Sequence, residues 1–301
     1  MDIKLKAIIA CLLWGSAFAG AKIGFQYAEP IFLSGLRFTL AGLMLFPLLL
    51  TSKIDISANL KHWRFMLLFA FVQTFLQYGL FFLGLNKVSG ATSAIIIGTG
   101  PLFIAIMAHI TLKNDKLTFR KILAIFLGIA GVTFISMAKG DLLSDNPSFY
   151  TGVAMLLLSN IIGSYTNIMV VKKKAHNISP IVLTAFANFV GGVMLFLASL
   201  IVEEPEFKAY PPEFYGALIW LAIIPAAGFT LWYGLLQRPE VKVSELNIWK
   251  FLIPVTGCIL SWTLLTDEHP DITSIFGIII ITAALLLLLL PERYFTKKSL
   301  K

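Results

Sequence analysis

The chain has 301 residues, of which 58% are hydrophobic and only 13% are charged, and its mean hydropathy is +0.85. These values lie far outside the range of soluble globular proteins and predict a membrane protein. The formal net charge of +8 does not point to nucleic acid, because no segment is polar enough and long enough to form a soluble domain. Any functional site must therefore lie within the membrane or in short loops.

Apolar segments recur along the whole chain at the length that a helix needs to cross a hydrocarbon layer, about 20 residues. The connections between them are short. We expect an all-α polytopic membrane protein with ten transmembrane helices and no cofactor. The predicted spans are residues 5–25, 30–50, 63–84, 88–112, 119–138, 150–171, 180–202, 214–236, 241–265 and 272–291.

The N-terminal "MDIKLK", with the apolar run and the small residues "AFA" (17–19) that follow it, resembles a secretory signal peptide and its cleavage site. The first span has a counterpart at 150–171, however, which argues against cleavage. Both cysteines, Cys11 and Cys258, fall within predicted spans. We therefore expect neither a disulfide framework nor a thiolate metal site.

The basic residues are distributed unevenly between the two sides of the predicted membrane. If the N-terminus is cytoplasmic, 18 of the 24 lysines and arginines fall on the inner side, which is the positive-inside pattern. Both termini should then be in the cytoplasm, and the protein should span the cell (inner) membrane. Arg37 and Lys250 lie within spans, and the outer side holds Lys22, Lys87, Lys139 and Lys208.

The two halves of the chain are related to each other. "PIFLSGLRFTLAGLMLF" (30–46) reappears as "PIVLTAFANFVGGVMLF" (180–196), with seven of seventeen positions identical. An odd number of crossings in each half places the second half upside down relative to the first. We expect an inverted five-helix repeat at 1–140, a second at 150–291, and a basic cytoplasmic tail at 292–301. Inverted repeats are typical of secondary transporters, whose halves rock around a site near the midplane.

A second pattern repeats with an offset of 153 residues instead of 150. Pro101, Asp115, Ala124 and Gly131 are spaced by 14, 9 and 7 residues, and the same spacings recur at Pro254, Glu268, Gly277 and Ala284. Pro101 and Pro254 are therefore predicted to interrupt equivalent helices and to act as hinges.

Several of these motifs resemble the EamA family of the drug/metabolite transporter superfamily. They are "WGSAF" (14–18), "P…GLRF" (30–38) and the doubled pattern "SAIIIGTGPLFIAIMAHITLKNDKLT" (93–118) and "SELNIWKFLIPVTGCILSWTLLTDE" (244–268). The resemblance implies ten helices in two inverted repeats, and carrier activity, often the export of amino acids or related metabolites. The sequence departs from the family at "KND" (113–115), where Asp115 replaces the usual glutamate.

Lys250 is the first candidate for a substrate-binding residue, because a charge in hydrocarbon costs about 2.5–3.5 kcal/mol even on lenient scales and normally faces protein or water. It lies too deep for its side chain to snorkel to the interface. Its helical neighbours include Asn247 and Pro254, and Trp249 precedes it. Pro254 also frees the carbonyl of Lys250 from its usual helical partner.

Further polar and aromatic residues within the spans could face the same cavity or pack between helices. Arg37 could bind substrate or snorkel, and the amides could bind a zwitterion or join helices. Arg37 aligns with Ala187 and Lys250 with Ile97, so neither charge is duplicated. The remaining candidates are Gln73, Gln77, Tyr78, Asn160, Ser164, Asn167, Trp14 and Tyr233.

The sequence predicts a secondary carrier of small zwitterionic or amphipathic metabolites, amino acids among them, that works by alternating access in the direction of export. Export of drugs, cations or nucleobase-like compounds is the alternative, and a channel or a non-transport membrane protein fits less well. Protons are a candidate coupling ion, although no carboxylate within the spans clearly suits one. Monomer and homodimer both remain open, and no enzyme or metal site is expected.

Overall fold

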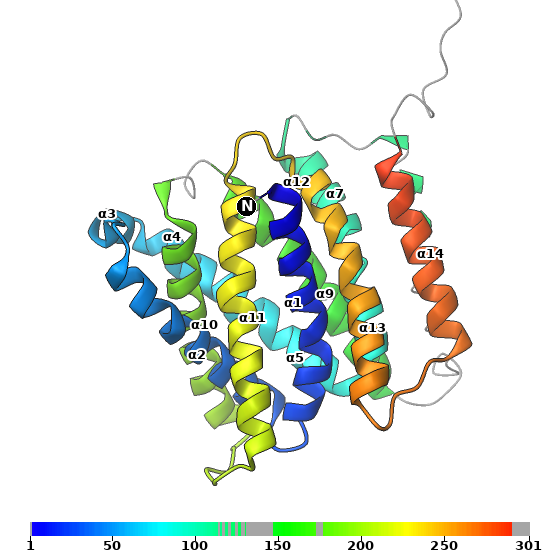
Figure 1. Ribbon diagram of the computed structural model, residues 1–301, viewed down its shortest axis with the longest axis horizontal. Helices are drawn as coiled ribbons and strands as arrows, with labels where there is room; N and C mark the ends of the chain where they lie inside the picture. The colour runs from blue at the N-terminus through cyan, green and yellow to red at the C-terminus, as the bar shows by residue number, and fades with distance from the viewer. Residues whose placement is uncertain are drawn as a thin grey trace, which may run out of the picture.

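The computed structural model describes residues 2–113, 147–172 and 177–290, together with positions 115, 118, 119, 122, 123, 126, 127 and 130. Most of the predicted fifth span, 119–138, and the whole basic tail, 292–301, lie outside the described residues. The described part is all helical and forms a bundle whose long helices run between two ends of the molecule (Figure 1).

Helices account for every regular element that the structure describes. The first half contains α1 (Ile3–Gly24), α2 (Pro30–Thr51), α3 (Ile56–Leu60), α4 (Trp63–Phe69), a π-helical segment η1 (Ala70–Leu76), α5 (Gln77–Lys87), α6 (Gly90–Ile97) and α7 (Gly100–Thr111). The second half contains α9 (Pro147–Val171), α10 (Pro180–Val202), α11 (Pro212–Leu236), α12 (Val243–Asn247), a 3₁₀ segment η3 (Ile248–Phe251), α13 (Leu252–Leu264) and α14 (Ile272–Leu289).

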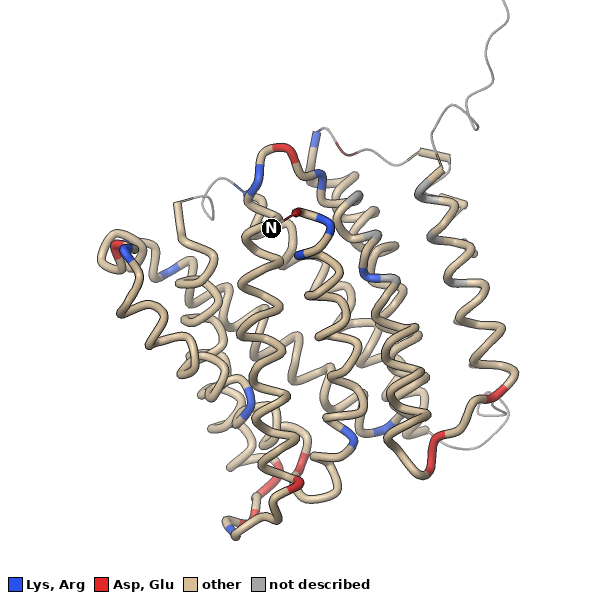
Figure 2. The backbone as a smooth tube through the Cα atoms, in the orientation of Figure 1, with Lys and Arg blue, Asp and Glu red and all other residues tan. Residues whose placement is uncertain are grey.

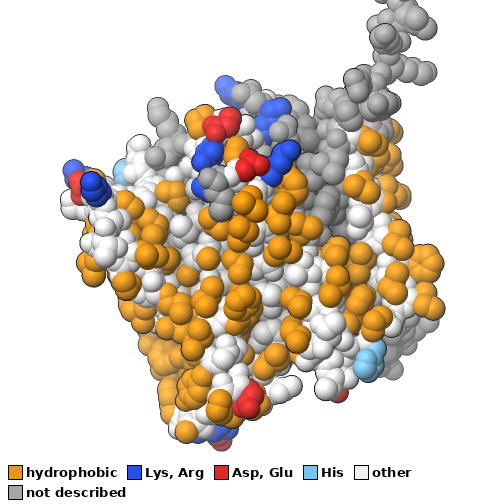
Figure 3. Space-filling model, in the orientation of Figure 1, with side chains coloured by type: hydrophobic (Ala, Val, Ile, Leu, Met, Phe, Trp, Pro, Cys, Tyr) orange, Lys and Arg blue, Asp and Glu red, His pale blue; other side chains and the backbone are white. Residues whose placement is uncertain are grey.

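Seven helical stretches of the described residues are long and apolar enough to cross a membrane. Apolar side chains cover the flank of the bundle between its two ends (Figure 3). The expected all-α membrane class is therefore confirmed. The seven stretches are Ile3–Gly24, Pro30–Thr51, Trp63–Lys87, Gly90–Thr111, Pro147–Val171, Pro180–Val202 and Pro212–Leu236, and Leu252–Leu264 and Ile272–Ala284 are shorter apolar helices.

The charged residues gather at the two ends, and the two ends differ in sign (Figure 2). The end that carries the N-terminus is rich in lysine and arginine, whereas the turns at the opposite end are rich in aspartate and glutamate. Basic residues lie at the start of α1 (Lys4, Lys6), between α2 and α4 or at the start of α4 (Lys53, Lys61, Arg64), and after α7, α9 and α11 (Lys113, Lys172, Arg238, Lys242). Acidic residues lie just before α2 (Glu29), between α10 and α11 or at the start of α11 (Glu203, Glu204, Glu206, Glu213), and between α13 and α14 (Asp267, Glu268, Asp271).

Two of the predicted spans are interrupted near their centres. Span 88–112 divides into α6 and α7 at Gly98 and Thr99, and span 241–265 divides into α12, η3 and α13. Pro101 lies in the first turn of α7 and Pro254 in the first turn of α13. A proline is tolerated there because the N–H groups of a first turn have no helical partner in any case. Each interruption therefore lies just before the proline.

α2 and α10 cross in close contact through a symmetric pair of glycines. A Cβ atom at Gly42 would lie 2.6 Å from the backbone nitrogen of Phe189, and a Cβ at Gly192 would meet the backbone of Phe38 and Thr39. Gly42 and Gly192 are 150 residues apart, as are Thr39 and Phe189. Equivalent positions therefore exchange contacts, as a two-fold relation between the halves requires. Small residues at a crossing let membrane helices approach closely.

Carboxylates of each half bind backbone N–H groups at helix starts of the other half. Glu268 accepts hydrogen bonds from the nitrogens of Gly90 (2.5 Å) and Ala91 (2.9 Å), at the start of α6. Asp115 accepts from the nitrogen (3.2 Å) and the hydroxyl (2.8 Å) of Ser244, at the start of α12. Because Asp115 and Glu268, like Ala91 and Ser244, are 153 residues apart, these are the same contact made twice.

α2 and α10 are tied in the same way, at opposite ends of the molecule. Glu203, just after α10, accepts from the nitrogens of Ile31 (2.7 Å) and Phe32 (2.8 Å) at the start of α2. Asn59, after α2, accepts from the nitrogen of Ser179 (2.6 Å) just before α10. Burial raises the pKa of Glu203, and the two N–H groups act in the opposite direction. Side chains thus satisfy helix termini across the boundary between the halves.

The glycine crossing gives a prediction for stability. We expect Gly192→Val to force α2 and α10 apart and to lower the stability of the protein by about 1–3 kcal/mol, the usual cost of overpacking a tight contact. Thermal unfolding in detergent measures the effect. Gly216→Val on α11 is the matched control, because a Cβ atom there meets nothing within 4 Å. Equal unfolding temperatures for the two variants would show that the crossing is not close-packed.

Candidate functional site

A central cavity lies between the two halves, and both halves contribute to its lining. The empty space within and in front of it amounts to about 830 Å³, which includes open solvent at its mouth. No aspartate or glutamate is among the described residues that line it, and the described residues contain no cluster of side chains that could hold a metal ion. The cavity is therefore polar and cationic in places, and aromatic elsewhere.

Most residues that the sequence singled out lie around this cavity, although they come from distant parts of the chain. Asn247 and Trp249 do not line it. The lining includes Trp14 on α1, Arg37 on α2, Gln73 on η1, Gln77 and Tyr78 on α5, Asn160, Ser164 and Asn167 on α9, Tyr233 on α11 and Lys250 on η3.

Asn247 and Trp249 have other surroundings. Asn247 is fully buried on α12, which packs against α7, and its amide nitrogen donates to the carbonyl of Val243 at 2.8 Å. Trp249 is half-buried and packs against the hydrophobic core. Sequence spacing had suggested a continuous helical face through Asn247 and Lys250. The chain changes from α12 to the 3₁₀ segment between them, where that spacing no longer holds.

Lys250 projects from the 3₁₀ segment that precedes α13, and it is half-buried at the cavity. Its ammonium nitrogen lies 5.0 Å from the ring centre of Trp232 and 5.6 Å from that of Trp14. These cation–π contacts account for part of its stabilisation, and no carboxylate among the described residues pairs with it. Ile97, the equivalent position in the first half, also lines the cavity but carries no charge. The charge is therefore confined to one half.

Arg37 is turned into the protein and does not snorkel toward the membrane surface. Only 1% of it is exposed, and its guanidinium carbon lies 4.6 Å from the ring centre of Phe38, 4.9 Å from that of Phe82 and 5.7 Å from that of Tyr78. Its Nε and Nη1 atoms have no hydrogen-bond partner among the described residues. Arg37 is thus a buried cation held by rings instead of by a carboxylate.

The polar stripe of α9 is largely occupied by contacts within the protein. Asn160 donates from its amide nitrogen to the carbonyl of Ile96 (2.9 Å) and to the hydroxyl of Thr99 (3.2 Å), where α6 gives way to α7. The backbone carbonyl oxygen of Asn160 accepts a hydrogen bond from the hydroxyl of Ser164 at 2.8 Å. The carbonyl of Ile96 also accepts from the backbone nitrogen (3.0 Å) and the hydroxyl (2.6 Å) of Thr99, so Asn160 adds a third hydrogen bond where the helix is interrupted. This residue therefore both stabilises the break and lines the cavity.

Asn167 and the two glutamines complete the amide lining. Asn167 accepts from the indole nitrogen of Trp232 at 2.9 Å, which fixes the orientation of that ring beside Lys250. Gln73 lies on the π-helical segment, a feature common at functional sites, and Gln77 follows it directly. The carbonyl oxygen of Gln77 is buried without a partner among the described residues. An acceptor is therefore available at this part of the cavity.

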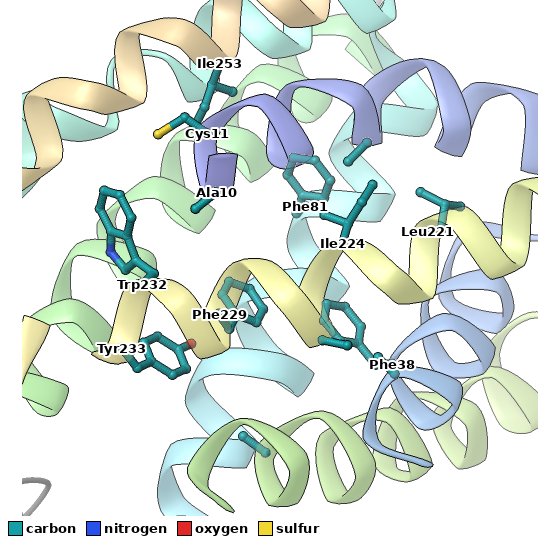
Figure 4. Close-up of a cluster of buried hydrophobic side chains, with 14 of the residues drawn as sticks. Ala10, Cys11, Phe38, Phe81, Leu221, Ile224, Phe229, Trp232, Tyr233 and Ile253 are labelled. Carbon is teal, nitrogen blue, oxygen red and sulfur yellow. The ribbon is translucent and has the colours of Figure 1, made fainter. Parts of the chain in front are cut away.

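Aromatic rings form a continuous row across the cavity. Trp14 lies 5.0 Å from Trp232 and 5.7 Å from Phe229, and Phe229 lies 5.8 Å from Tyr78 and is stacked on Tyr233 at 5.4 Å. Trp232, Phe229 and Tyr233 all project from one stretch of α11 (Figure 4). Offset and edge-on ring pairs at these separations are favourable.

Some of the rings in the lining, Phe18, Phe81 and Phe229, were not among the residues that the sequence singled out. An apolar ring in an apolar span carries no signal that separates a cavity wall from the lipid face or from the core. Only their position in the folded bundle distinguishes them.

Comparison with known proteins agrees with this architecture. Residues 3–137 and 150–290 each match the EamA-like transporter family. A solved crystal structure with 19% sequence identity superimposes with a TM-score of 0.74 and covers 95% of this chain and 96% of its own, which supports the fold.

Two bacterial relatives extend over most of the sequence. One is named uncharacterized transporter YoaV of Bacillus subtilis (strain 168), which is 23% identical over 283 residues and covers 93% of this chain and 94% of the relative. Another is the S-adenosylmethionine/S-adenosylhomocysteine transporter of Chlamydia trachomatis serovar L2, which is 24% identical over 265 residues and covers 86% of this chain and 80% of the relative. With both of its halves matched, the chain belongs to the EamA-like transporter family and is a membrane transporter of a small molecule, not an enzyme.

Proposed function

We propose that the protein is a secondary carrier that exports amino acids or related zwitterionic and amphipathic metabolites, and that the central cavity is its substrate-binding site. The observation that carries the proposal is Lys250. Lys250 is a cation within a predicted span, has no carboxylate partner among the described residues, and lies at a cavity lined by both halves. Such a charge is costly to bury and normally marks the path of a substrate or ion.

The symmetric contacts between the halves support alternating access. At one end Glu268 holds the start of α6, and at the other Asp115 holds the start of α12. Opening the cavity toward one side requires the contacts at that side to separate while those at the other side remain. Because the two contacts occupy equivalent positions in the two halves, breaking one and keeping the other would give two alternative states, as a carrier needs.

The lining supports an amphipathic substrate with an acidic group. Lys250 and the amides suit a carboxylate, and the row of rings suits an apolar or aromatic body. The Chlamydia relative is named for an amino-acid derivative that also carries a nucleoside, so nucleobase-containing metabolites are a second candidate class. Cationic drugs fit less well, because two cations already face the cavity and no described lining residue is acidic.

The proposal includes ten transmembrane helices in two inverted repeats with both termini in the cytoplasm. It is supported by the basic character of the end that carries the N-terminus and the acidic character of the other end (Figure 2).

The role of Lys250 can be tested directly. We expect Lys250→Ala to reduce transport by at least about tenfold while leaving the protein folded, because the loss of one charge-assisted contact is worth about 1.5–3 kcal/mol. Uptake and counterflow of labelled amino acids in liposomes containing the purified variant measure this. Saturable flux with counterflow indicates a carrier, whereas unsaturable flux indicates a channel.

The matched control for this variant is Lys53→Ala, which removes an exposed lysine at the end of the bundle. It should transport as the wild type does. Normal transport by a folded Lys250→Ala protein would show that Lys250 does not take part in substrate binding.

The orientation can be tested with single cysteines. Cys11 and Cys258 are both buried and are replaced by alanine, and cysteine is then introduced at Ser57 or at Glu206, which are exposed at opposite ends. We expect a membrane-impermeant maleimide to label position 206 in intact cells, and position 57 only after lysis. The reverse pattern would contradict a cytoplasmic N-terminus.

A further inference from the structure

We infer that the cavity selects substrates with a net negative charge, organic acids with an apolar or aromatic body, and that Arg37 binds an acidic group of the substrate at a second subsite, apart from Lys250. This inference rests on the proposed function, because it takes the central cavity to be the substrate-binding site. It goes further by narrowing the proposed substrates to amphipathic acids, which the cavity would bind more tightly than zwitterions, and by assigning a separate anion subsite.

The charge balance of the lining is the first argument. Arg37 and Lys250 both face the cavity, and the described lining residues include no carboxylate. A zwitterion would bring an ammonium group into a region that already holds two positive charges. An acid would instead neutralise one of them, and a diacid both. In a region of low dielectric constant the difference between these ligands is large.

The unpartnered polar atoms are the second argument. Among the described lining residues, the buried side-chain atoms without hydrogen-bond partners are Nε and Nη1 of Arg37, Nε1 of Trp14, the hydroxyl of Tyr233 and the carbonyl oxygen of Gln77. All but the last can donate. A ligand that satisfies these groups must offer mainly acceptors, and a carboxylate offers two oxygens that only accept.

A purely structural role for Arg37 explains less. The rings of Phe38, Phe82 and Tyr78 stabilise the guanidinium but accept no conventional hydrogen bond from its Nε and Nη1 atoms. The equivalent residue of the second half is Ala187, which is buried to the same extent, so the repeated scaffold packs at this position without an arginine. Arg37 is therefore an addition to the scaffold that requires a partner.

The two cations are bound to different parts of the row of rings. Lys250 contacts Trp14, Trp14 contacts Phe229, Phe229 contacts Tyr78, and Tyr78 contacts Arg37. A molecule with an acidic group at Arg37, another at Lys250 and an apolar body against the rings would use every part of this surface. A molecule with a single acidic group would use one of the two cations.

The test uses four probes that share a benzyl group. Phenylalanine, 3-phenylpropanoate and benzylsuccinate share a 3-phenylpropanoate skeleton. The carbon beside the carboxylate carries an ammonium group, a hydrogen or a carboxymethyl group, respectively, so benzylsuccinate has two carboxylates. Phenethylamine has the ammonium group alone. We measure the affinity of the purified full-length protein for each by isothermal titration, and then the transport of each in liposomes.

For the wild type we expect the affinity to fall in the order benzylsuccinate, 3-phenylpropanoate, phenylalanine, phenethylamine, with steps of about tenfold between the first and the third. Arg37→Gln should lose at least about tenfold in affinity for benzylsuccinate and less for 3-phenylpropanoate, which can still bind at Lys250. Arg37→Lys keeps the charge and should retain part of the preference. Arg64→Gln is the control, because Arg64 is exposed and lies over Trp63 away from the cavity.

The inference is overturned if the wild type binds phenylalanine or phenethylamine as tightly as benzylsuccinate, if it binds none of the probes, or if folded Arg37→Gln keeps the wild-type order. Should Arg37→Gln fail to fold, the wild-type order alone decides. The proposed function fails separately. Tight binding of benzylsuccinate without transport of any probe would refute the carrier and leave the anion subsite in place, whereas transport of phenylalanine without a preference for acids would do the opposite.

Discussion

A hydrocarbon layer offers no hydrogen bonds, so each polar group within the spans must find a partner inside the protein or face a cavity. This constraint explains most of what the structure contains. Asn160 donates a hydrogen bond to a carbonyl at the break before α7, and Glu203 and Glu268 accept hydrogen bonds from the first N–H groups of α2 and α6. Some of the polar side chains that are not used in this way line the central cavity, among them Arg37, Gln77 and Tyr233.

The same constraint ties the two halves together. Where the N–H groups of a helix start bind a carboxylate of the other half, the two halves cannot separate without leaving those N–H groups unpaired. The contacts of Glu268 and Asp115 place such hydrogen bonds at both ends of the bundle. These residues lie at the ends of the bundle, where water can replace such a partner. In the proposed carrier, the contacts would close an end and be broken when that end opens.

Onto this symmetric scaffold the chain adds charges that are not symmetric. Lys250 has Ile97 as its counterpart, and Arg37 has Ala187. The fold does not need either cation, because the other half packs without one. Arg37 and Lys250 have no charged counterpart in the other half, although the backbone repeats. They are therefore the first candidates for substrate recognition, and both face the cavity.

Much of this could be predicted from the sequence. Hydropathy predicted the membrane class, and the repeat spacing and motifs predicted the family, which comparison confirms. The burial of charge within spans picked out Lys250 and Arg37. Patterns of 3.6 residues per turn did not locate the wall of the cavity completely, because η3 and η1 depart from that period, so Asn247 was assigned to a face that it does not share.

The hydrogen-bond partners of polar side chains could also not be predicted from the sequence. The hydrogen bonds of Asn160 to the broken helix and of Asn167 to Trp232 join residues more than sixty positions apart. Nothing in the local pattern distinguishes an amide that binds a substrate from one that binds a carbonyl. The rings of Phe81 and Phe229 were missed for the same reason, since every span contains such rings.

The central claim is that the two halves move against each other around the cavity, and distances between spin labels test it most directly. One pair of labels would be placed at Ser57 and Glu240, at the N-terminal end, and another at Asn86 and Glu206, at the opposite end; all four positions are exposed, and each pair joins the two halves. Pulsed electron paramagnetic resonance should show the two distances changing in opposite directions when a transported acid is added. Distances that stay fixed at both ends, or that lengthen together, would contradict alternating access.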